Sequence, residues 1–230
     1  MSDAVEQAQA PEEAEGGAEP QAQVAEISEH ERELRARALA EVRAYGDPVL
    51  RSRASEVSEF GPELERQATR MVSIMRDAMG VGLAATQLGV LRRLLVFQAG
   101  QAATPSAVAN PEIEWVSDEL EIAEEGCLSL PGIGVDVERP LHARVRGLDL
   151  RGEPMLLEAS GLEARVLQHE IDHLDGILVL DRTVREQRKG AMRALREGEA
   201  YSPRQDEDED EDGPPSAGLE PPAEGGELRA

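Results

Sequence analysis

The chain has 230 residues, of which 47 are acidic and 24 are lysine or arginine, giving a formal net charge of −23 at pH 7. This excess of negative charge argues against a general affinity for nucleic acid. The sequence contains no run of about 20 apolar residues, so no membrane span is expected. Its acidic start lacks the basic and apolar segments of a secretory signal.

The two ends differ in composition from the middle. Residues 1–30 carry eight acidic residues and no lysine or arginine, and residues 201–230 carry ten acidic and two basic residues. Each end therefore contributes −8, which leaves −7 for residues 31–200. Such ends bury too little apolar surface to offset the entropy lost on ordering. We predict disordered acidic tails over 1–30 and 201–230, and one compact domain over 31–200.

The first half of this domain predicts two helices. A capping box formed by Ser28 and Glu31 opens a helix that runs to about residue 43. After a turn at Asp47-Pro48, Gly61-Pro62 opens a second helix that runs to about residue 79. This helix has apolar residues at three- and four-residue spacing, which is typical of core packing: Leu64, Ala68, Met71, Met75 and Met79.

The second half predicts strands and then helices. Short apolar segments bounded by turn residues predict strands over 93–97, 106–111, 112–123, 134–138, 143–150 and 154–159. A helix over 161–174 follows and ends at Gly176, before a short strand over 177–180 and a charged helix over 184–199. This order predicts an α+β fold, with antiparallel β-sheets packed around one central helix and flanked by further helices.

The predicted helix over 161–174 carries the most informative motif, His169-Glu170-Ile171-Asp172-His173. Residues four apart in a helix stand on one face, about 6 Å apart along the axis. Two imidazoles in this position can bind one metal ion, and the glutamate between them can reach water on that ion. The alternative is an amphipathic helix with two histidines near its buried edge.

The only cysteine, Cys127, lies 42 residues before His169. A single cysteine cannot form an intramolecular disulfide. As a third ligand it would complete a Cys-His-His site with a fourth position open for water, as catalytic metal sites require. Thiolate and imidazole ligands suit zinc, iron or another late first-row metal. The alternative is a small buried apolar residue, which is the usual environment of a free cysteine.

A glycine-rich segment over 80–87 reads Gly-Val-Gly-Leu-Ala-Ala-Thr-Gln. Glycines allow a backbone to pass close to a ligand, and the amide of Gln87 can stabilise an oxyanion without competing for a metal. The segment lacks the glycine and lysine pattern of a phosphate-binding loop. The alternative is a tight turn with an exposed glutamine.

Taken in order, three segments resemble the three signatures of peptide deformylases. They are G-x-G-L-A-A-x-Q over 80–87, E-G-C-L-S over 125–129 and H-E-x-D-H-L-x-G over 169–176. The resemblance extends from about residue 42 to about residue 196, so the domain over 31–200 is expected to be a deformylase catalytic domain. Neither acidic end is part of the pattern.

The resemblance implies a metal-dependent hydrolase that removes the formyl group from the N-terminal formyl-methionine of newly made polypeptides. The implied metal ligands are Cys127, His169 and His173. Glu170 would be the general base when metal-bound water attacks, while Gln87 and the backbone N–H of Leu128 would stabilise the oxyanion. Members of this family characteristically use Fe²⁺ and often accept zinc, nickel or cobalt.

The resemblance also implies further roles near the site. Substrate contacts are expected from Gly82, Leu83 and Gly126, and a methionine pocket is expected to include Leu83, Ile133 and Val166. Glu125 is expected to pair with Arg139 and orient the ligands, although Arg139 could equally be an ordinary surface charge. Asp172 is expected to brace the helix or a histidine.

The expected partners are N-formylmethionyl nascent peptides, with transient proximity to the ribosome. A metal-binding thiol without disulfides fits the cytoplasm. Two other functions stay open. A zincin-type metallopeptidase shares H-E-x-x-H, but it usually takes its third ligand after the motif, where this chain has no further histidine. A deformylase-like binding module without activity would be expected to lack a ligand, the base or Gln87.

Overall fold

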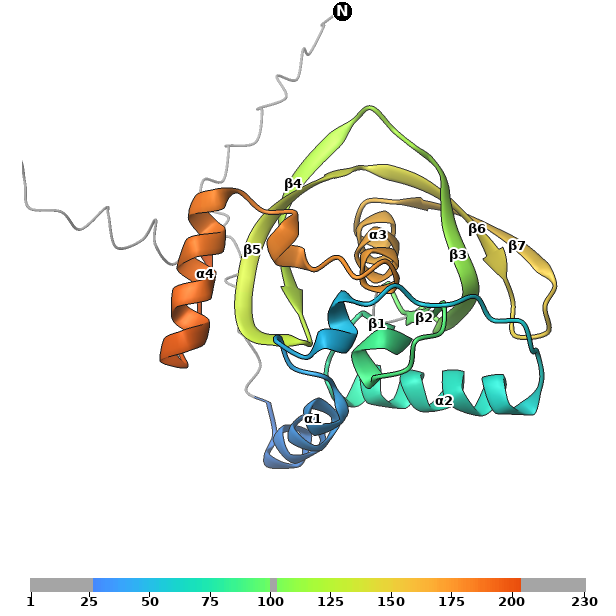
Figure 1. Cartoon of the computed structure of the whole chain (residues 1–230), viewed down its shortest axis with the longest axis horizontal. Coiled ribbons are helices and arrows are strands. Elements are labelled where there is room, and N and C mark those ends of the chain that lie inside the picture. The colour runs from blue at the N-terminus through green and yellow to red at the C-terminus, as the bar shows by residue number, and fades with distance from the viewer. Residues whose placement is uncertain (1–26, 100–102, 204–230) are drawn as a thin grey trace, which may run out of the picture.

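The computed structural model describes residues 27–99 and 103–203 (Figure 1). Helix α1 spans Glu29–Glu41 and begins at the predicted capping box. Ser28 N–H donates to Glu31 Oε2 at 2.8 Å, and Glu31 N–H donates to Ser28 Oγ at 3.2 Å. The helix ends two residues earlier than predicted, because Val42 adopts an extended backbone.

Helix α2 spans Pro62–Asp77 and packs against α1, β1 and β2. The predicted apolar stripe is buried as expected at Leu64, Ala68, Met71 and Met75. Met79 is the exception, because it lies beyond the helix with a left-handed backbone (φ 61°) and its residue is 55% exposed. A turn of 3₁₀ helix over Pro48–Arg51 precedes α2 and follows the predicted Asp47-Pro48 turn.

Seven strands form two antiparallel sheets. The larger sheet has the order β1-β2-β3-β6-β7, and a two-stranded sheet pairs β4 with β5. The strands of the larger sheet are β1 Gly82–Ala84, β2 Leu94–Phe97, β3 Ser106–Val116, β6 His142–Leu148 and β7 Pro154–Ser160. The smaller sheet consists of β4 Leu120–Cys127 and β5 Leu130–Pro140. The antiparallel α+β class is confirmed.

Three strand predictions differ from the structure. The predicted boundary between 106–111 and 112–123 is wrong, because β3 continues through Pro111 at an irregular register and a new strand begins only at Leu120. A bulge tolerates a proline, since it lacks a regular ladder hydrogen bond there. The predicted strand over 177–180 is also wrong, because Val179–Asp181 forms a 3₁₀ turn. Strand β1 was not predicted, since three residues carry no periodic signal.

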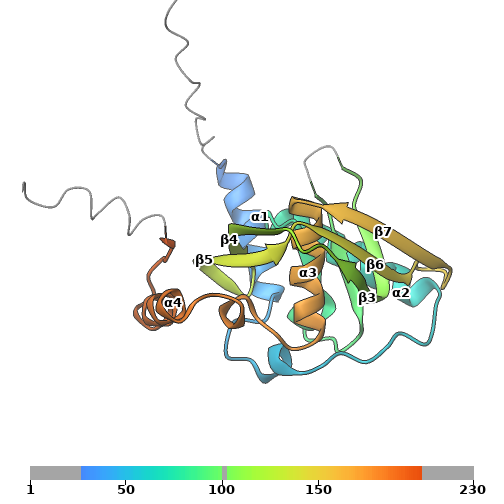
Figure 2. The ribbon, with the colours of Figure 1, turned by 90° about the horizontal axis from the view of Figure 1, so that it is seen from above.

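Helix α3, Leu162–Leu174, lies at the centre of the molecule between the larger sheet and the β4–β5 ribbon (Figures 1 and 2). It contacts strands of both sheets, and ten of its residues are buried. Gly176 follows it with φ 75°, as expected for a glycine that ends a helix. The predicted central helix is therefore confirmed.

Helix α4, Arg185–Glu197, packs on the outer side of β5, away from α3 (Figure 1). None of the helices in the described part of the chain is long and apolar enough to cross a membrane. Residues 201–203 belong to the folded unit, because Tyr201 forms a parallel bridge with Ile133. Residues 1–26 and 204–230 lie outside the described residues, so the acidic tails stay a prediction.

Candidate metal centre

The two histidines of the H-E-x-x-H motif lie one above the other on α3. Their ring centroids are 4.8 Å apart, and the rings are inclined by 78°. Cys127, at the end of β4, faces them, with its Sγ 3.2 Å from His173 Nε2. The ligand atoms of these three residues lie within 4.8 Å of one another. The fold therefore brings Cys127 beside two histidines that follow it in the sequence by 42 and 46 positions.

These residues fit a late first-row metal ion. One thiolate and two imidazoles form a donor set for such an ion rather than for magnesium or calcium. Beside them, Glu170 Oε2 is buried and accepts no hydrogen bond from the described residues. An unsatisfied buried carboxylate oxygen normally has a ligand or water as its partner. A metal site with water beside Glu170 accounts for both observations.

Glu170 lies against the backbone of β1. A Cβ added to Gly82 would overlap Glu170 Oε1 and lie 2.8 Å from its Cδ. Only glycine therefore allows the strand and the carboxylate to approach this closely. Burial raises the pKa of Glu170 to about 7. A carboxyl group with this pKa can both accept and donate a proton near neutral pH.

Glu125 orients His169. The Nδ1–H of His169 donates to Glu125 Oε2 at 2.9 Å, which leaves Nε2 for the ligand cluster. Arg139 donates two hydrogen bonds to the same carboxylate at 2.6 and 2.9 Å. Burial would raise the pKa of Glu125, but the hydrogen bonds from His169 and Arg139 outweigh it and lower the pKa to about 2. The expected Glu125–Arg139 pair is present, and Arg139 is buried.

Two residues join this buried network without having been predicted. Arg165, one turn before His169 on α3, donates to Glu125 Oε1 at 2.8 Å and to the carbonyl of Val137 at 2.9 Å. Arg165 stands four residues before His169, so a helix places both on one face, and this spacing could have indicated the contact. Arg182 donates to Asp172 at 3.0 Å, and Arg139 donates to the same carboxylate at 2.9 Å. Asp172 therefore braces the helix, as expected.

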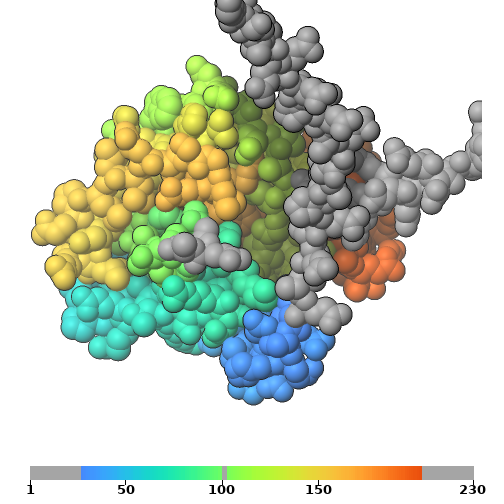
Figure 3. Space-filling view, turned by 180° about the vertical axis from the view of Figure 1, so that it is seen from behind, coloured from blue at the N-terminus to red at the C-terminus, as the bar shows by residue number. Residues whose placement is uncertain are grey.

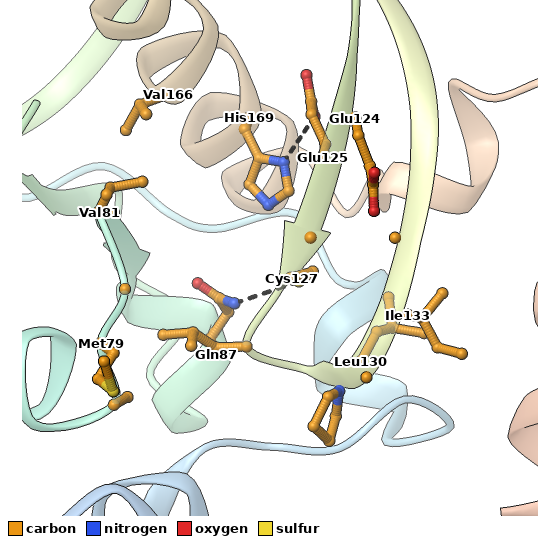
Figure 4. A pocket seen from close by; sticks show the side chains of 18 of the residues that line it. Met79, Val81, Gln87, Glu124, Glu125, Cys127, Leu130, Ile133, Val166 and His169 are labelled. Atoms are coloured by element: carbon orange, nitrogen blue, oxygen red, sulfur yellow. Dashed lines mark hydrogen bonds and ion pairs between the residues drawn. The ribbon is translucent and has the colours of Figure 1, made fainter. Parts of the chain in front are cut away.

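Gln87 presents its amide nitrogen to the cysteine (Figure 4). Its Oε1 accepts a hydrogen bond from the Ala84 N–H at 2.9 Å, so the orientation of the amide is fixed. Its Nε2 then lies 3.7 Å from Cys127 Sγ and 3.3 Å from Ser129 Oγ. The alternative of an exposed glutamine is wrong, because Gln87 is only 1% exposed.

A pocket of about 500 Å³ opens beside these residues. Figure 3 shows this side of the molecule, hollowed between the olive β4–β5 ribbon, the orange α3 and the teal end of α2. Cys127, Gln87, His169 and Glu170 line the inner part. The apolar wall consists of Met79, Val81, Leu128, Leu130, Ile133 and Val166 (Figure 4). Ile133 and Val166 are therefore placed as expected.

Of the three residues expected to contact substrate, two line the pocket and one does not. Gly82 and Gly126 line the pocket. The expectation that the Leu83 side chain contributes is wrong, because it is fully buried in the core beside α2. Successive side chains of a strand point to opposite faces, so Leu83 turns away when Gly82 faces the pocket. Arg35 and Leu39 of α1 also line the pocket, together with residues 200–202, and no sequence pattern predicted their place there.

The fold and the donor set define a metal-dependent hydrolase of the H-E-x-x-H type, with its third ligand before the motif. Residues 39–189 match the family model of polypeptide deformylase. The chain is 45% identical over 162 residues to a peptide deformylase of Acidothermus cellulolyticus, covering 70% of this chain and 88% of that protein. It is 50% identical over 141 residues to a peptide deformylase of Thermotoga neapolitana, covering 61% of this chain and 85% of that protein.

Solved structures agree with these relatives. A peptide deformylase from Synechococcus elongatus in complex with actinonin aligns with a TM-score of 0.65 and 40% identity, covering 70% of this chain and 88% of that one. The peptide deformylase from Thermotoga maritima aligns with a TM-score of 0.60 and 46% identity, covering 62% of this chain and 96% of that one. The chain belongs to the polypeptide deformylase family, metal-dependent hydrolases that deformylate N-formyl-methionine peptides.

Proposed function

We propose that the pocket beside Cys127, His169 and His173 is the deformylase active site of this chain, with Fe²⁺ bound by these three residues. The observation that carries the proposal is the convergence of their ligand atoms within 4.8 Å, next to a buried carboxylate and a fixed amide. When bound, the ion polarises the formyl carbonyl and makes water acidic enough to act as a nucleophile at neutral pH. Zinc, nickel or cobalt would suit the same donors.

Glu170 is the proton carrier in this proposal. Its carboxylate takes the proton from the attacking water and later delivers it to the nitrogen of the departing amine. Contact with Gly82 holds the carboxylate in place beside the ligand cluster. Departure of the amine leaves formate and a free N-terminal methionine.

Negative charge that develops on the formyl oxygen is stabilised by the amide nitrogen of Gln87 and the backbone N–H of Leu128. The hydrogen bond from the Ala84 N–H fixes the Gln87 amide before the substrate arrives. A donor held in this way is typically worth about 3 kcal/mol in the transition state. Ser129, which also contacts Gln87, holds the amide from the other side.

The peptide part of the substrate is proposed to pair with the outer edge of β1, which is an edge strand of the larger sheet. The methionine side chain would then enter the apolar wall that includes Ile133 and Val166. Nascent chains beginning with formyl-methionine are the proposed partners, with ribosome proximity only transient. The need for a reduced Cys127 favours the cytoplasm.

The test is substrate discrimination by the Fe²⁺-loaded chain, purified without oxygen. We expect formate release from formyl-Met-Ala-Ser, little reaction with acetyl-Met-Ala-Ser, and no cleavage of the internal peptide bonds. Cleavage of internal bonds without formate release would instead support a metallopeptidase. A fully metal-loaded chain that hydrolyses neither peptide would support a binding module.

A further inference from the structure

One face of α4 is strongly basic, although the chain as a whole is strongly acidic. Basic residues recur at three-, four- and eight-residue intervals along the helix and are exposed: Arg185, Arg188, Lys189, Arg193 and Arg196. At 3.6 residues per turn these positions fall on one side, here called the basic face. The opposite side packs on β5 through Ala191 and Ala194. The stripe of charge is therefore an ordered surface of the domain.

Most of this charge is uncompensated within residues 27–99 and 103–203. Arg188 alone makes an ion pair there, to Asp181 at 3.7 Å, and Asp181 is shared with Arg51. The other four basic side chains have no carboxylate partner in this part of the chain. Like charges so close together repel one another, so an anionic partner on the basic face would be stabilising.

The chain after α4 turns back beside the same helix. Gly198 ends α4 with φ 73°, and Tyr201 is then fixed between β5 and the helix. Tyr201 N–H donates to the carbonyl of Gly132 at 2.9 Å, and Gly134 N–H donates to the carbonyl of Tyr201 at 2.7 Å. The tyrosine ring rests on Gly190 of α4, where an added Cβ would lie 2.9 Å from Cζ. The direction of the returning chain is therefore set by backbone contacts.

Pro203 lines one surface pocket together with all five residues of the basic face. The end of the described chain therefore lies beside that face. Asp206 is the first of seven consecutive acidic residues, over 206–212, and lies three residues beyond Pro203. At about 3.5 Å per residue it stays within about 10 Å of Pro203. Seven extended residues span about 24 Å, and a 13-residue helix is about 20 Å long.

We propose that the acidic segment 206–212 docks on the basic face of α4 in the same chain. Its charge, its length and its starting point match the face that it would cover. Tethering gives the segment an effective concentration in the millimolar range, so even weak binding would occupy the face. The face is then closed to other polyanions unless they bind more tightly. The contact is electrostatic and exposed, so salt weakens it.

The test uses the full-length, metal-loaded chain and a fluorescein-labelled peptide with the sequence of residues 204–214. In one variant, the seven acidic residues of 206–212 are replaced by Asn or Gln. We expect the peptide to bind this variant at least tenfold more tightly than the unsubstituted chain, with affinity falling as NaCl rises. The added substitutions Arg185→Gln, Lys189→Gln and Arg193→Gln should abolish the gain, whereas Arg32→Gln, Arg37→Gln and Arg66→Gln should preserve it.

A matched control separates docking from net charge. Residues 1–26 also contain seven acidic residues, and replacing them by Asn or Gln changes the charge of the chain by the same amount. We expect peptide affinity to stay within about twofold of the unsubstituted chain. The proposal is overturned if this control raises the peptide affinity as much as the 206–212 variant does. It is also overturned if the unsubstituted chain and the 206–212 variant bind the peptide equally well, or if neither of them binds it.

Discussion

Gly82 and Glu170 touch across the interface of β1 and α3, and the contact leaves no room for a methyl group. Gly82→Ala should therefore displace the carboxylate while leaving the three proposed metal ligands in place. A shift of about 1 Å in a catalytic group can cost about 10²-fold in rate. We expect kcat to fall by about this factor at unchanged metal content, measured by formate release and elemental analysis.

Gly80→Ala is the matched control for this substitution. A Cβ at Gly80 would lie 2.9 Å from Cδ1 of the flexible Leu128 side chain and 3.4 Å from the Gly82 carbonyl oxygen, which is an ordinary contact distance. The neighbour can move, so we expect a loss of less than about tenfold. Equal losses in both variants would show that the segment, rather than the Glu170 contact, is sensitive.

The Glu125 carboxylate lies between two buried arginines and His169, a proposed metal ligand. Glu125→Gln keeps the shape but leaves Arg139 and Arg165 without their shared carboxylate. Removing one partner of a buried ion pair costs about 3–5 kcal/mol, and loss of the His169 contact should weaken metal binding by 10- to 100-fold. Urea unfolding and competition with a chelator measure the two effects.

Glu121→Gln provides the comparison, because Glu121 is an exposed carboxylate that also contacts Arg165, at 3.3 Å. Exposed pairs contribute up to about 1 kcal/mol, so stability should change little and metal affinity should not change. If Glu125→Gln behaved like Glu121→Gln, the orienting role assigned to Glu125 would be wrong.

Met79 combines a left-handed backbone with a place in the pocket wall. Asparagine adopts this conformation more readily than methionine, so Met79→Asn should leave stability unchanged or raise it by about 0.5 kcal/mol. The lost apolar contact should raise KM for formyl-Met-Ala-Ser about three- to tenfold, with kcat unchanged. An unchanged KM would exclude Met79 from the methionine pocket.

The lowered pKa of Asp181, which lies away from the proposed metal site, should make the free energy of unfolding depend on pH. Partial burial would raise the pKa of Asp181, but hydrogen bonds from Arg51 and from the Leu178 N–H outweigh it and lower the pKa. A carboxyl group whose pKa is lower in the folded chain stabilises the fold at pH values above its unfolded-state pKa, near 3.9. This stabilisation is lost as the pH falls through the lower pKa of the folded state.

Asp181→Asn should therefore reduce the free energy of unfolding at pH 7, and its difference from the unsubstituted chain should shrink below about pH 4. Urea unfolding at pH 7, 5 and 3 measures the difference. Asp118→Asn, at an exposed turn with no ion pair in the described residues, should show no such trend. A constant difference for Asp181→Asn would contradict the assigned cause.

The parts of the site that depend on local spacing could be predicted from sequence. His169 and His173 share a face because they are four residues apart in a helix, and the glycine segment predicted a close backbone approach. The contact of Gly82 with Glu170 joins residues 88 positions apart, so no local pattern could reveal it. The burial of Leu83 depends on β1 being a strand, which three residues do not signal.

Longer-range features of the fold were missed for the same reason. Pro111 suggested the end of a strand, yet tertiary pairing carries β3 through it with a bulge. The return of Tyr201 onto β5 and α4 depends on Gly132 and Gly190, which composition does not connect with an acidic chain end. Composition therefore placed the domain boundary at 200, three residues before the described chain ends.

Glu170 is proposed to transfer protons at a metal centre held by Cys127, His169 and His173. The most direct measurement compares formate release from formyl-Met-Ala-Ser by the Fe²⁺-loaded chain and by Glu170→Gln, with metal content determined for both. We predict one ion per chain in each protein and a loss of about 10²- to 10⁴-fold in kcat for the variant. A variant that kept its rate with the ion bound, or a fully loaded unsubstituted chain that released no formate, would contradict the account.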